Sequence, residues 1–119
     1  MGKIEKFEDL KVWKDSVSLA TEIYRQFKTL HDFGYRDQIQ RAAVSVPSNI
    51  AEGYERQSNN EFIRFLYIAK GSCGELRTQV YPGIELEYLD KEKGKSLLEQ
   101  TREISAMLYG LIQTRKRNF

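Results

Sequence analysis

The sequence has 119 residues, which is room for one domain spanning residues 1–119, since single domains commonly contain about 100–150 residues. Nineteen basic and 17 acidic residues give a formal net charge of +2, which excludes a strongly basic nucleic-acid tail and an acidic tail. One Cys and one His exclude an intramolecular disulfide, a cysteine-based zinc site and a cluster of histidine ligands within one chain.

Residues 8–30 carry apolar side chains at spacings of three and four, which predicts an amphipathic helix. Asp9 suits the N-terminal cap or the first turn of this helix, because an acid is favoured at the positive end of the helix dipole. Gly34 suits the left-handed conformation that commonly ends helices. The apolar stripe consists of Leu10, Trp13, Val17, Ala20, Tyr24 and Phe27.

Residues 35–56 form a second helical pattern that contains Pro47. Proline removes one backbone donor and crowds the preceding turn. We expect a kink at Pro47 rather than the end of the helix, because the apolar stripe resumes in phase at Ile50. Residues 57–60 form the next connection. The stripe consists of Ile39, Ala42, Ala43, Val46, Ile50 and Tyr54.

The third helical pattern begins after Ser58, which forms a predicted capping box with Glu61. Pro82 and Gly83 disfavour continuation of this helix, although the apolar residues after them indicate about one more turn. The stripe consists of Phe62, Phe65, Leu66, Ala69, Cys73, Leu76 and Val80.

Asp90 is the predicted cap of the fourth helix, whose apolar face runs from Leu97 to Ile112. The helix ends in three cations, Arg115 to Arg117, which suit a helix C-terminus. Four helices of about twenty residues with short connections predict an all-α, up-down-up-down four-helix bundle.

The uncharged run of residues 42–51 is much shorter than the roughly 20 apolar residues that span a membrane. The N-terminal residues lack the apolar region of a signal peptide. We therefore expect a cytoplasmic protein with no membrane partner.

Polar residues form a second stripe beside the apolar one in residues 38–52. One interpretation is a binding surface made of Arg41, Asn49 and Arg56. The other, which we favour, is a set of hydrogen bonds between helices or a wet subunit interface, because polar groups beside a core usually satisfy one another. The stripe consists of Gln38, Arg41, Ser45, Asn49 and Glu52, with Glu61, Ser72, Glu75 and Gln79 at helical offsets in the third helix.

Gly71 and Gly74 lie in the middle of the third helix, where each glycine costs about 1 kcal/mol of helix stability relative to alanine. We expect a close approach to another helix at this point, with the small residues Ala42 and Ala43 opposite. No phosphate-binding motif surrounds these glycines. Cys73 between them is expected to be a buried structural thiol, since nothing brings a base such as His31 near it.

The sequence contains no Glu-x-x-His motif, so we expect no dimetal site, no metal and no cofactor. Glu52 and Glu75 could form a catalytic carboxylate pair, but ion pairing with Arg41 or Arg56 is a simpler interpretation. We therefore expect no enzyme activity.

Residues 91–119 carry seven cations and three acids, a net charge of +4. A basic patch built from these cations would bind phosphates. An ordinary solvated surface with a charged end is the alternative, and the sequence leaves both open. The cations are Lys91, Lys93, Lys95, Arg102, Arg115, Lys116 and Arg117.

Three ordered motifs support a family resemblance that covers nearly the whole chain. They are Phe7-x-Asp9-Leu10-x-Val12-Trp13, Gln38-Ile39-x-Arg41-Ala42-Ala43-x-Ser45-Val46-x-x-Asn49-Ile50-Ala51-Glu52-Gly53, and Arg56-x-Ser58-x-x-Glu61-Phe62-x-Arg64-Phe65-Leu66-x-Ile68-Ala69-x-Gly71-Ser72-x-x-Glu75-Leu76. The chain thereby resembles the 23S rRNA-intervening-sequence proteins, also called S23 ribosomal proteins. That name records reading frames inside insertions of bacterial 23S rRNA genes and states no biochemical activity.

The resemblance implies a left-handed four-helix bundle that assembles as a homopentamer. A related pentameric bundle, the accessory variability protein of diversity-generating retroelements, binds nucleic acid and a reverse transcriptase, and this supports nucleic-acid binding here by analogy only. The chain departs from the family pattern at Tyr81-Pro82-Gly83, where the family continues an ordinary helix. In a pentamer, aromatic residues would anchor the subunit contacts. The candidates are Trp13, Tyr24 and Tyr67.

The signature residues around the second connection have an equally structural interpretation. Asn49 and Ser58 can satisfy exposed backbone groups, and Arg56 can pair with Glu52 one turn earlier. The signature would then specify fold and assembly rather than a ligand. Its polar and glycine members are Gln38, Arg41, Ser45, Asn49, Glu52, Gly53, Arg56, Ser58 and Glu75.

Our first hypothesis is a pentameric, non-enzymatic protein that binds RNA or DNA through basic surface residues. The contacts would be mainly to phosphates, because the sequence shows no stacking platform and no groove-reading motif. A protein-interaction scaffold with no nucleic-acid role is the alternative. The candidate contacts are Lys91, Lys93, Lys95, Arg115, Lys116 and Arg117, with Arg41 and Arg56 as weaker candidates.

Overall fold

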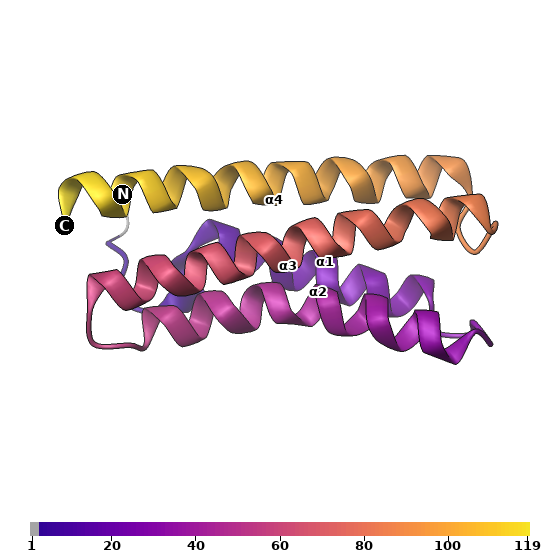
Figure 1. Ribbon diagram of the computed structural model, residues 1–119, viewed down its shortest axis with the longest axis horizontal. Coiled ribbons are helices and arrows are strands. Elements are labelled where there is room, and N and C mark those ends of the chain that lie inside the picture. Colours follow the sequence, from indigo (N-terminus) through magenta and orange to yellow (C-terminus); the bar gives the residue numbers. More distant parts are fainter. Residues whose placement is uncertain (1–2) are drawn as a thin grey trace.

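The computed structural model describes residues 3–119 and contains four long helices (Figure 1). Consecutive helices run in opposite directions along a molecule 45 Å long. The predicted all-α, up-down-up-down four-helix bundle is therefore confirmed. Within residues 3–119, no helix is long and apolar enough to cross a membrane. The elements are η1 (Phe7–Asp9), α1 (Lys11–Gln26), α2 (Phe33–Tyr54), α3 (Asn59–Glu85) and α4 (Lys91–Asn118).

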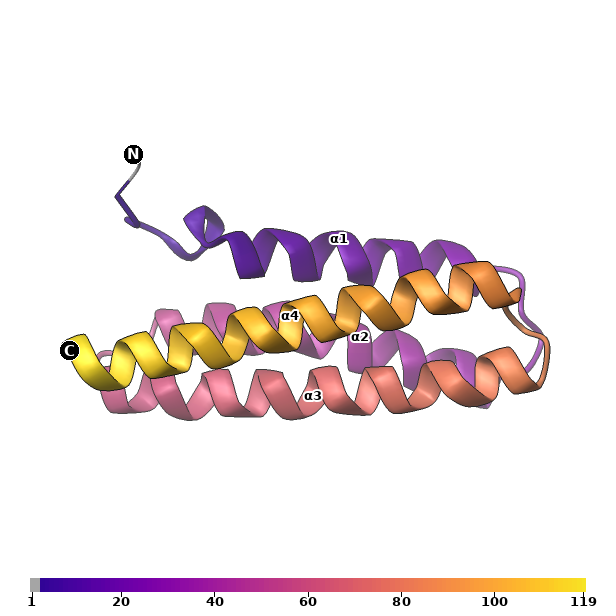
Figure 2. The same ribbon diagram turned by 90° about the horizontal axis from the view of Figure 1, so that it is seen from above.

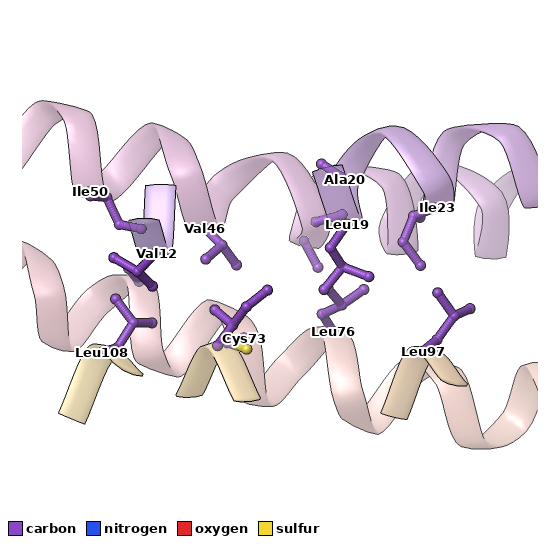
Figure 3. Close-up of a cluster of buried hydrophobic side chains, with 14 of the residues drawn as sticks. Val12, Leu19, Ala20, Ile23, Val46, Ile50, Cys73, Leu76, Leu97 and Leu108 are labelled. Atoms are coloured by element: carbon purple, nitrogen blue, oxygen red, sulfur yellow. The ribbon is translucent and has the colours of Figure 1, made fainter. Parts of the chain in front are cut away.

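One continuous apolar core runs along the axis of the bundle, and all four helices contribute to it (Figure 3). Because each helix presents apolar residues at spacings of three and four, these side chains meet in the centre. Those that are fully buried include Leu19, Ile23, Ile50, Leu76 and Leu108. The stripes predicted for α2, α3 and α4 thus form most of the core. The stripe predicted for α1 is partly wrong, because Val12, Leu19 and Ile23 are buried instead, whereas Trp13, Val17 and Tyr24 line a groove between α1 and α2.

The chain begins differently from the prediction, because Asp9 does not cap α1. Its carboxylate instead accepts hydrogen bonds from the backbone amides of Glu5 and Lys6, at 3.1 and 3.3 Å. These bonds close the short 3-10 helix η1, and α1 starts at Lys11 without a side-chain cap.

Gly34 also differs from the prediction, since it lies in the first turn of α2 and has no left-handed conformation. The reason is Asp32, whose side chain accepts a hydrogen bond from the amide of Tyr35 at 3.2 Å and caps α2 just before Gly34. The first helix already ends at Gln26, and Phe27 follows it as a buried residue.

Neither proline ends its helix. The second helix continues through Pro47, as predicted, and α3 continues through Pro82 to Glu85. Near Pro82 the Tyr35 hydroxyl donates a hydrogen bond to the carbonyl of Gln79 at 2.5 Å. A Cβ atom at Gly83 would overlap this hydroxyl, so glycine permits the contact. Tyr35 thus ties α2 to the last turns of α3.

The close approach between α2 and α3 occurs at Gly53, where an added Cβ would lie 2.5 Å from the Cβ of Phe65. The expected close approach at Gly71 and Gly74 is wrong, because an added Cβ at either position has no atom within 4 Å. These two glycines lie on the outer surface of α3, whereas Ala42 and Ala43 are buried in the core.

This difference predicts opposite effects for two glycine-to-alanine substitutions. Gly53→Ala should lower the free energy of unfolding by about 1–3 kcal/mol, because α2 and α3 must separate to admit the methyl group. Gly71→Ala should raise it by about 1 kcal/mol, because it improves helix propensity in open space. Urea denaturation at one protein concentration measures both, and destabilisation by Gly71→Ala would contradict the account.

Candidate nucleic-acid interface

The polar stripe of α2 is satisfied largely within its own helix. The Ser45 hydroxyl donates to the carbonyl of Ala42, and the Asn49 amide donates to the carbonyl of Ser45, both at 2.8 Å. Among residues 3–119, the hydrogen bonds expected between helices from these two side chains are not found. The local bonds favour a structural role for Ser45 and Asn49.

The connection from α2 to α3 contains a small ion-pair network. Arg56 lies 3.0 Å from Glu52, as predicted, and 3.7 Å from Glu61. Glu61 also pairs with Arg64 at 3.2 Å, and this hydrogen bond lowers the pKa of the Glu61 carboxyl. The Ser58 hydroxyl caps α3 by accepting from the Glu61 amide at 3.1 Å. The carboxylate of Glu61 thus binds arginines.

Two neighbouring grooves, whose linings share Arg41 and Ser45, contain the carboxylates that were considered as a catalytic pair. Glu75 lines a groove between α2 and α3, together with Gln38 and Arg41. Glu52 lines another groove, beside Tyr24. The described residues, 3–119, contain no group of three or more His, Cys, Asp or Glu side chains that could hold a metal ion.

Cys73 is buried, as predicted, and its thiol donates to the carbonyl of Thr101 on α4 at 3.2 Å. Burial raises the pKa of the Cys73 thiol from 9.0 to about 11. His31 lies exposed in the α1–α2 connection. The structure therefore keeps the thiol protonated and away from the histidine, which is unsuited to nucleophilic catalysis.

The predicted basic residues of α4 fall into two groups at opposite ends of the bundle (Figure 2). Lys91, Lys93 and Lys95 lie at the start of α4, while the three cations from Arg115 onward lie in its last turn. Twenty-two residues of helix separate Lys93 from Arg115, which is about 33 Å. The structure therefore does not bring them together into one patch.

The group at the start of α4 is partly neutralised. The Lys93 ammonium lies 2.9 Å from the carboxylate of Glu22 on α1, and this hydrogen bond lowers the pKa of Glu22. Asp90 caps the same end of α4 by accepting from the Lys93 amide at 2.8 Å. Acidic side chains thus accompany the lysines at this end.

The group at the end of α4 has different partners. The Arg115 guanidinium donates to the side-chain oxygen of Asn59 at 2.7 Å and stacks 3.7 Å from the Phe119 ring centre. The Lys116 ammonium donates to the Tyr67 hydroxyl at 2.8 Å. Within residues 3–119, no carboxylate lies within 4.0 Å of Arg115, Lys116 or Arg117. No carboxylate compensates these charges, and Lys116 and Arg117 are exposed, whereas Arg115 is half-buried.

The helix connections explain why this end gathers cations. The α2–α3 connection and the end of α4 lie at the same end of the bundle (Figure 1). Asn59, at the start of α3, donates back to the carbonyl of Arg115 at 3.0 Å and closes a reciprocal pair. Sequence analysis did not assign Asn59 or Tyr67 to this region, because their partners lie 56 and 49 residues away.

The predicted interface aromatics do not share one surface. Trp13 and Tyr24 both line an apolar groove between α1 and α2, which also contains Val44. Tyr24 is 46% exposed and Val44 is 40% exposed. Tyr67 lies on α3 instead, beside Lys116.

Comparisons of the sequence and of the structure with known proteins point to the same family. The profile of the 23S rRNA-intervening sequence proteins matches residues 8–110. A crystal structure of a protein of unknown function from the S23 ribosomal protein family of Bacteroides thetaiotaomicron superposes with a TM-score of 0.80 at 29% sequence identity. The match covers 87% of this chain and 96% of that one. No curated protein matches the sequence significantly.

The burial of Cys73 predicts slow alkylation in the folded chain. Iodoacetamide at about pH 8 should label Cys73 rapidly in guanidinium chloride and hardly at all under native conditions, because thiolate is the reactive form. Since the unfolded thiol ionises about two pH units earlier, the free energy of unfolding should also fall as the pH rises from about 9 to 11. Mass spectrometry measures the labelling, and equal native and denatured rates would contradict the buried position.

Proposed function

The chain belongs to the 23S rRNA-intervening sequence protein family, and on this premise we propose that it is a non-enzymatic, oligomeric bundle that binds RNA or DNA. The contacts come from the cations in the last turn of α4 and are made mainly to phosphates. The observation that carries the proposal is the absence of any carboxylate within 4.0 Å of Arg115, Lys116 or Arg117 in the described part of the chain, residues 3–119.

Charge availability distinguishes this end of the molecule from two of the other predicted contacts, Lys93 and Arg56. An ion-paired lysine such as Lys93 must break its bond to Glu22 before it binds a phosphate, whereas Lys116 gives up only a hydrogen bond to a neutral hydroxyl. Arg56 is likewise paired with Glu52. Counterion release therefore favours the end of α4 over Lys93 and Arg56.

Self-association would multiply this charge. We propose that a second copy covers the apolar groove between α1 and α2, where Trp13, Tyr24 and Val44 offer a half-exposed apolar surface. Repetition of the contact around a ring of five chains would place five copies of the α4 terminus in one assembly. A symmetric array of cations raises the local field and strengthens binding to a polyanion.

Charge reversal tests the nucleic-acid contact. Replacement of Arg115, Lys116 and Arg117 by Glu should weaken binding to a labelled single strand and flatten its salt dependence, with the log–log slope falling by about 2. Fluorescence anisotropy between about 50 and 200 mM salt measures this slope. The matched control reverses three exposed cations at the opposite end, Arg25, Lys28 and Lys91, with the same change in net charge.

Equal losses in the charge-reversed variant and its control would show that net charge alone governs binding. No binding by the unmodified chain at low salt would contradict nucleic-acid binding altogether. A stoichiometric protein partner that resists nuclease treatment would then favour the alternative, an interaction scaffold.

Substitution in the apolar groove tests self-association. Tyr24→Glu should lower the mass in solution towards the 13.9 kDa of one chain, because a buried carboxylate opposes contact between copies. Leu86→Glu is the control, since Leu86 is 57% exposed and lies outside this groove. Light scattering after size exclusion measures the mass. An unchanged oligomer in the Tyr24→Glu variant would contradict a contact through this groove.

A further inference from the structure

The outer surface formed by α3 and α4 combines exposed tyrosines with cations. Tyr67, Tyr81 and Tyr109 are 45%, 47% and 55% exposed. Cations from both helices lie among these rings. We call this surface the tyrosine–cation face, and it consists of Tyr67, Lys70, Arg77 and Tyr81 on α3 with Lys95, Arg102, Tyr109 and Lys116 on α4.

Helical periodicity places these residues on a common side. On α4, the members follow one another every seven residues, which is about two turns and 10.5 Å. On α3, Tyr67 and Tyr81 lie fourteen residues apart and therefore also share a side. Lys70 and Arg77 lie one turn to either side of Cys73, whose thiol contacts Thr101 on α4. These two cations therefore lie on the flank of α3 that faces α4.

Two contacts join the helices across this face. The Lys116 ammonium donates to the Tyr67 hydroxyl at 2.8 Å and lies 5.2 Å from the centre of its ring. Fourteen residues earlier on α4, Arg102 donates to the Tyr81 hydroxyl at 3.3 Å. Each tyrosine is thus held beside a cation while about half of its surface stays accessible.

The cations of this face lack acidic partners. Within residues 3–119, no carboxylate lies within 4.0 Å of Lys70, Arg77, Lys95, Arg102 or Lys116. Glu99 is one helical turn from both Lys95 and Arg102 but pairs with neither. The face therefore keeps a net positive charge over the roughly 32 Å from Lys95 to Lys116.

The middle of α3 leaves space for a ligand between the two tyrosines. Gly71 and Gly74 lie on the outer surface there, and an added Cβ at either position has no atom within 4 Å. At these two positions between Tyr67 and Tyr81 the backbone of α3 carries no side chain. A flat ring or a strand can approach the helix closely at this point.

We propose that the tyrosine–cation face binds single-stranded nucleic acid, with bases stacked on the three tyrosine rings and phosphates on the five cations. This inference rests on the proposed function, and Lys116 belongs to both surfaces. Proteins that bind single strands combine a positively charged track with aromatic rings, because every base has a flat face that stacks. A duplex keeps its bases stacked on one another, so the tyrosines would add nothing to duplex binding.

Matched tyrosine substitutions test the stacking contact. The triple variant with Tyr67, Tyr81 and Tyr109 replaced by Leu removes the rings but keeps apolar side chains, whereas the triple replacement by Phe keeps the rings and removes only the hydroxyls. Fluorescence anisotropy of the two variants and the unmodified chain, with labelled oligo-dT, oligo-U and a duplex of equal length, gives nine affinities. We expect the Leu variant to lose at least tenfold for both single strands and less than twofold for the duplex. The Phe variant should bind within about twofold of the unmodified chain.

Charge substitutions test the phosphate contacts on the same oligonucleotides. Lys70→Gln with Arg77→Gln should reduce the log–log salt slope for oligo-U by about 1.4. Glu99→Gln should tighten binding of the single strand, because it removes a carboxylate one helical turn from both Lys95 and Arg102. Circular dichroism melting checks that each variant is folded, which we expect because all these side chains are at least partly exposed.

The outcomes separate this inference from the proposed function. If the unmodified chain binds no oligonucleotide at low salt, both the proposed function and this inference are overturned. A second outcome is binding that weakens with salt, prefers neither single strand nor duplex and is unchanged in the Leu variant. This outcome overturns the tyrosine–cation face alone and leaves the α4 terminus as the contact. A loss confined to single strands in the Leu variant supports the face, and a difference between oligo-dT and oligo-U then shows which of the two strands it prefers.

Discussion

The close contact between α2 and α3 at Gly53 controls the arrangement of one whole end of the bundle. Because Gly53 has no side chain, the Cβ of Phe65 reaches the backbone of α2. The Phe65 ring then lies 4.8 Å from the guanidinium groups of both Arg56 and Arg64. The same short connection brings Asn59 to the carbonyl of Arg115 on α4. Helix packing at Gly53 and local bonds thus account for part of the polar signature, whereas Gln38, Arg41 and Glu75 line a groove between α2 and α3. Asn59 ties the end of α4 to this connection.

Pairing, more than the number of charges, determines which cations remain available. Lys93 and Arg56 belong to ion pairs, so their positive charge is largely compensated inside the chain. Lys116 instead contacts a tyrosine hydroxyl, which leaves its charge uncompensated. Because a phosphate must compete with any existing carboxylate, the uncompensated cations dominate the affinity for a polyanion. The modest net charge of +2 therefore gives a poor measure of what one face of the molecule can bind.

Apolar periodicity predicted the four helices correctly, because each stripe is a local property of the sequence. Contacts between distant residues were not predictable in this way. Because Asp32 caps α2, Gly34 lies in the first turn of that helix and does not end α1. Because Gly71 lies on the outer surface, no second helix packs closely against it. Sequence analysis also found no stacking platform, since Tyr67 and Tyr109 come together only when α3 packs beside α4. The seven-residue spacing from Lys95 to Lys116 was nevertheless present in the sequence as a signal.

The most direct test of nucleic-acid binding is a map of the contacted residues. Addition of unlabelled oligo-U to the ¹⁵N-labelled protein at low salt should shift amide resonances on the outer sides of α3 and α4 and at the end of α4. The shifts should disappear as salt is raised, because the contacts are mainly to phosphates. Resonances along the groove between α1 and α2 should stay unchanged. An unperturbed spectrum, or shifts confined to that groove, would contradict the account.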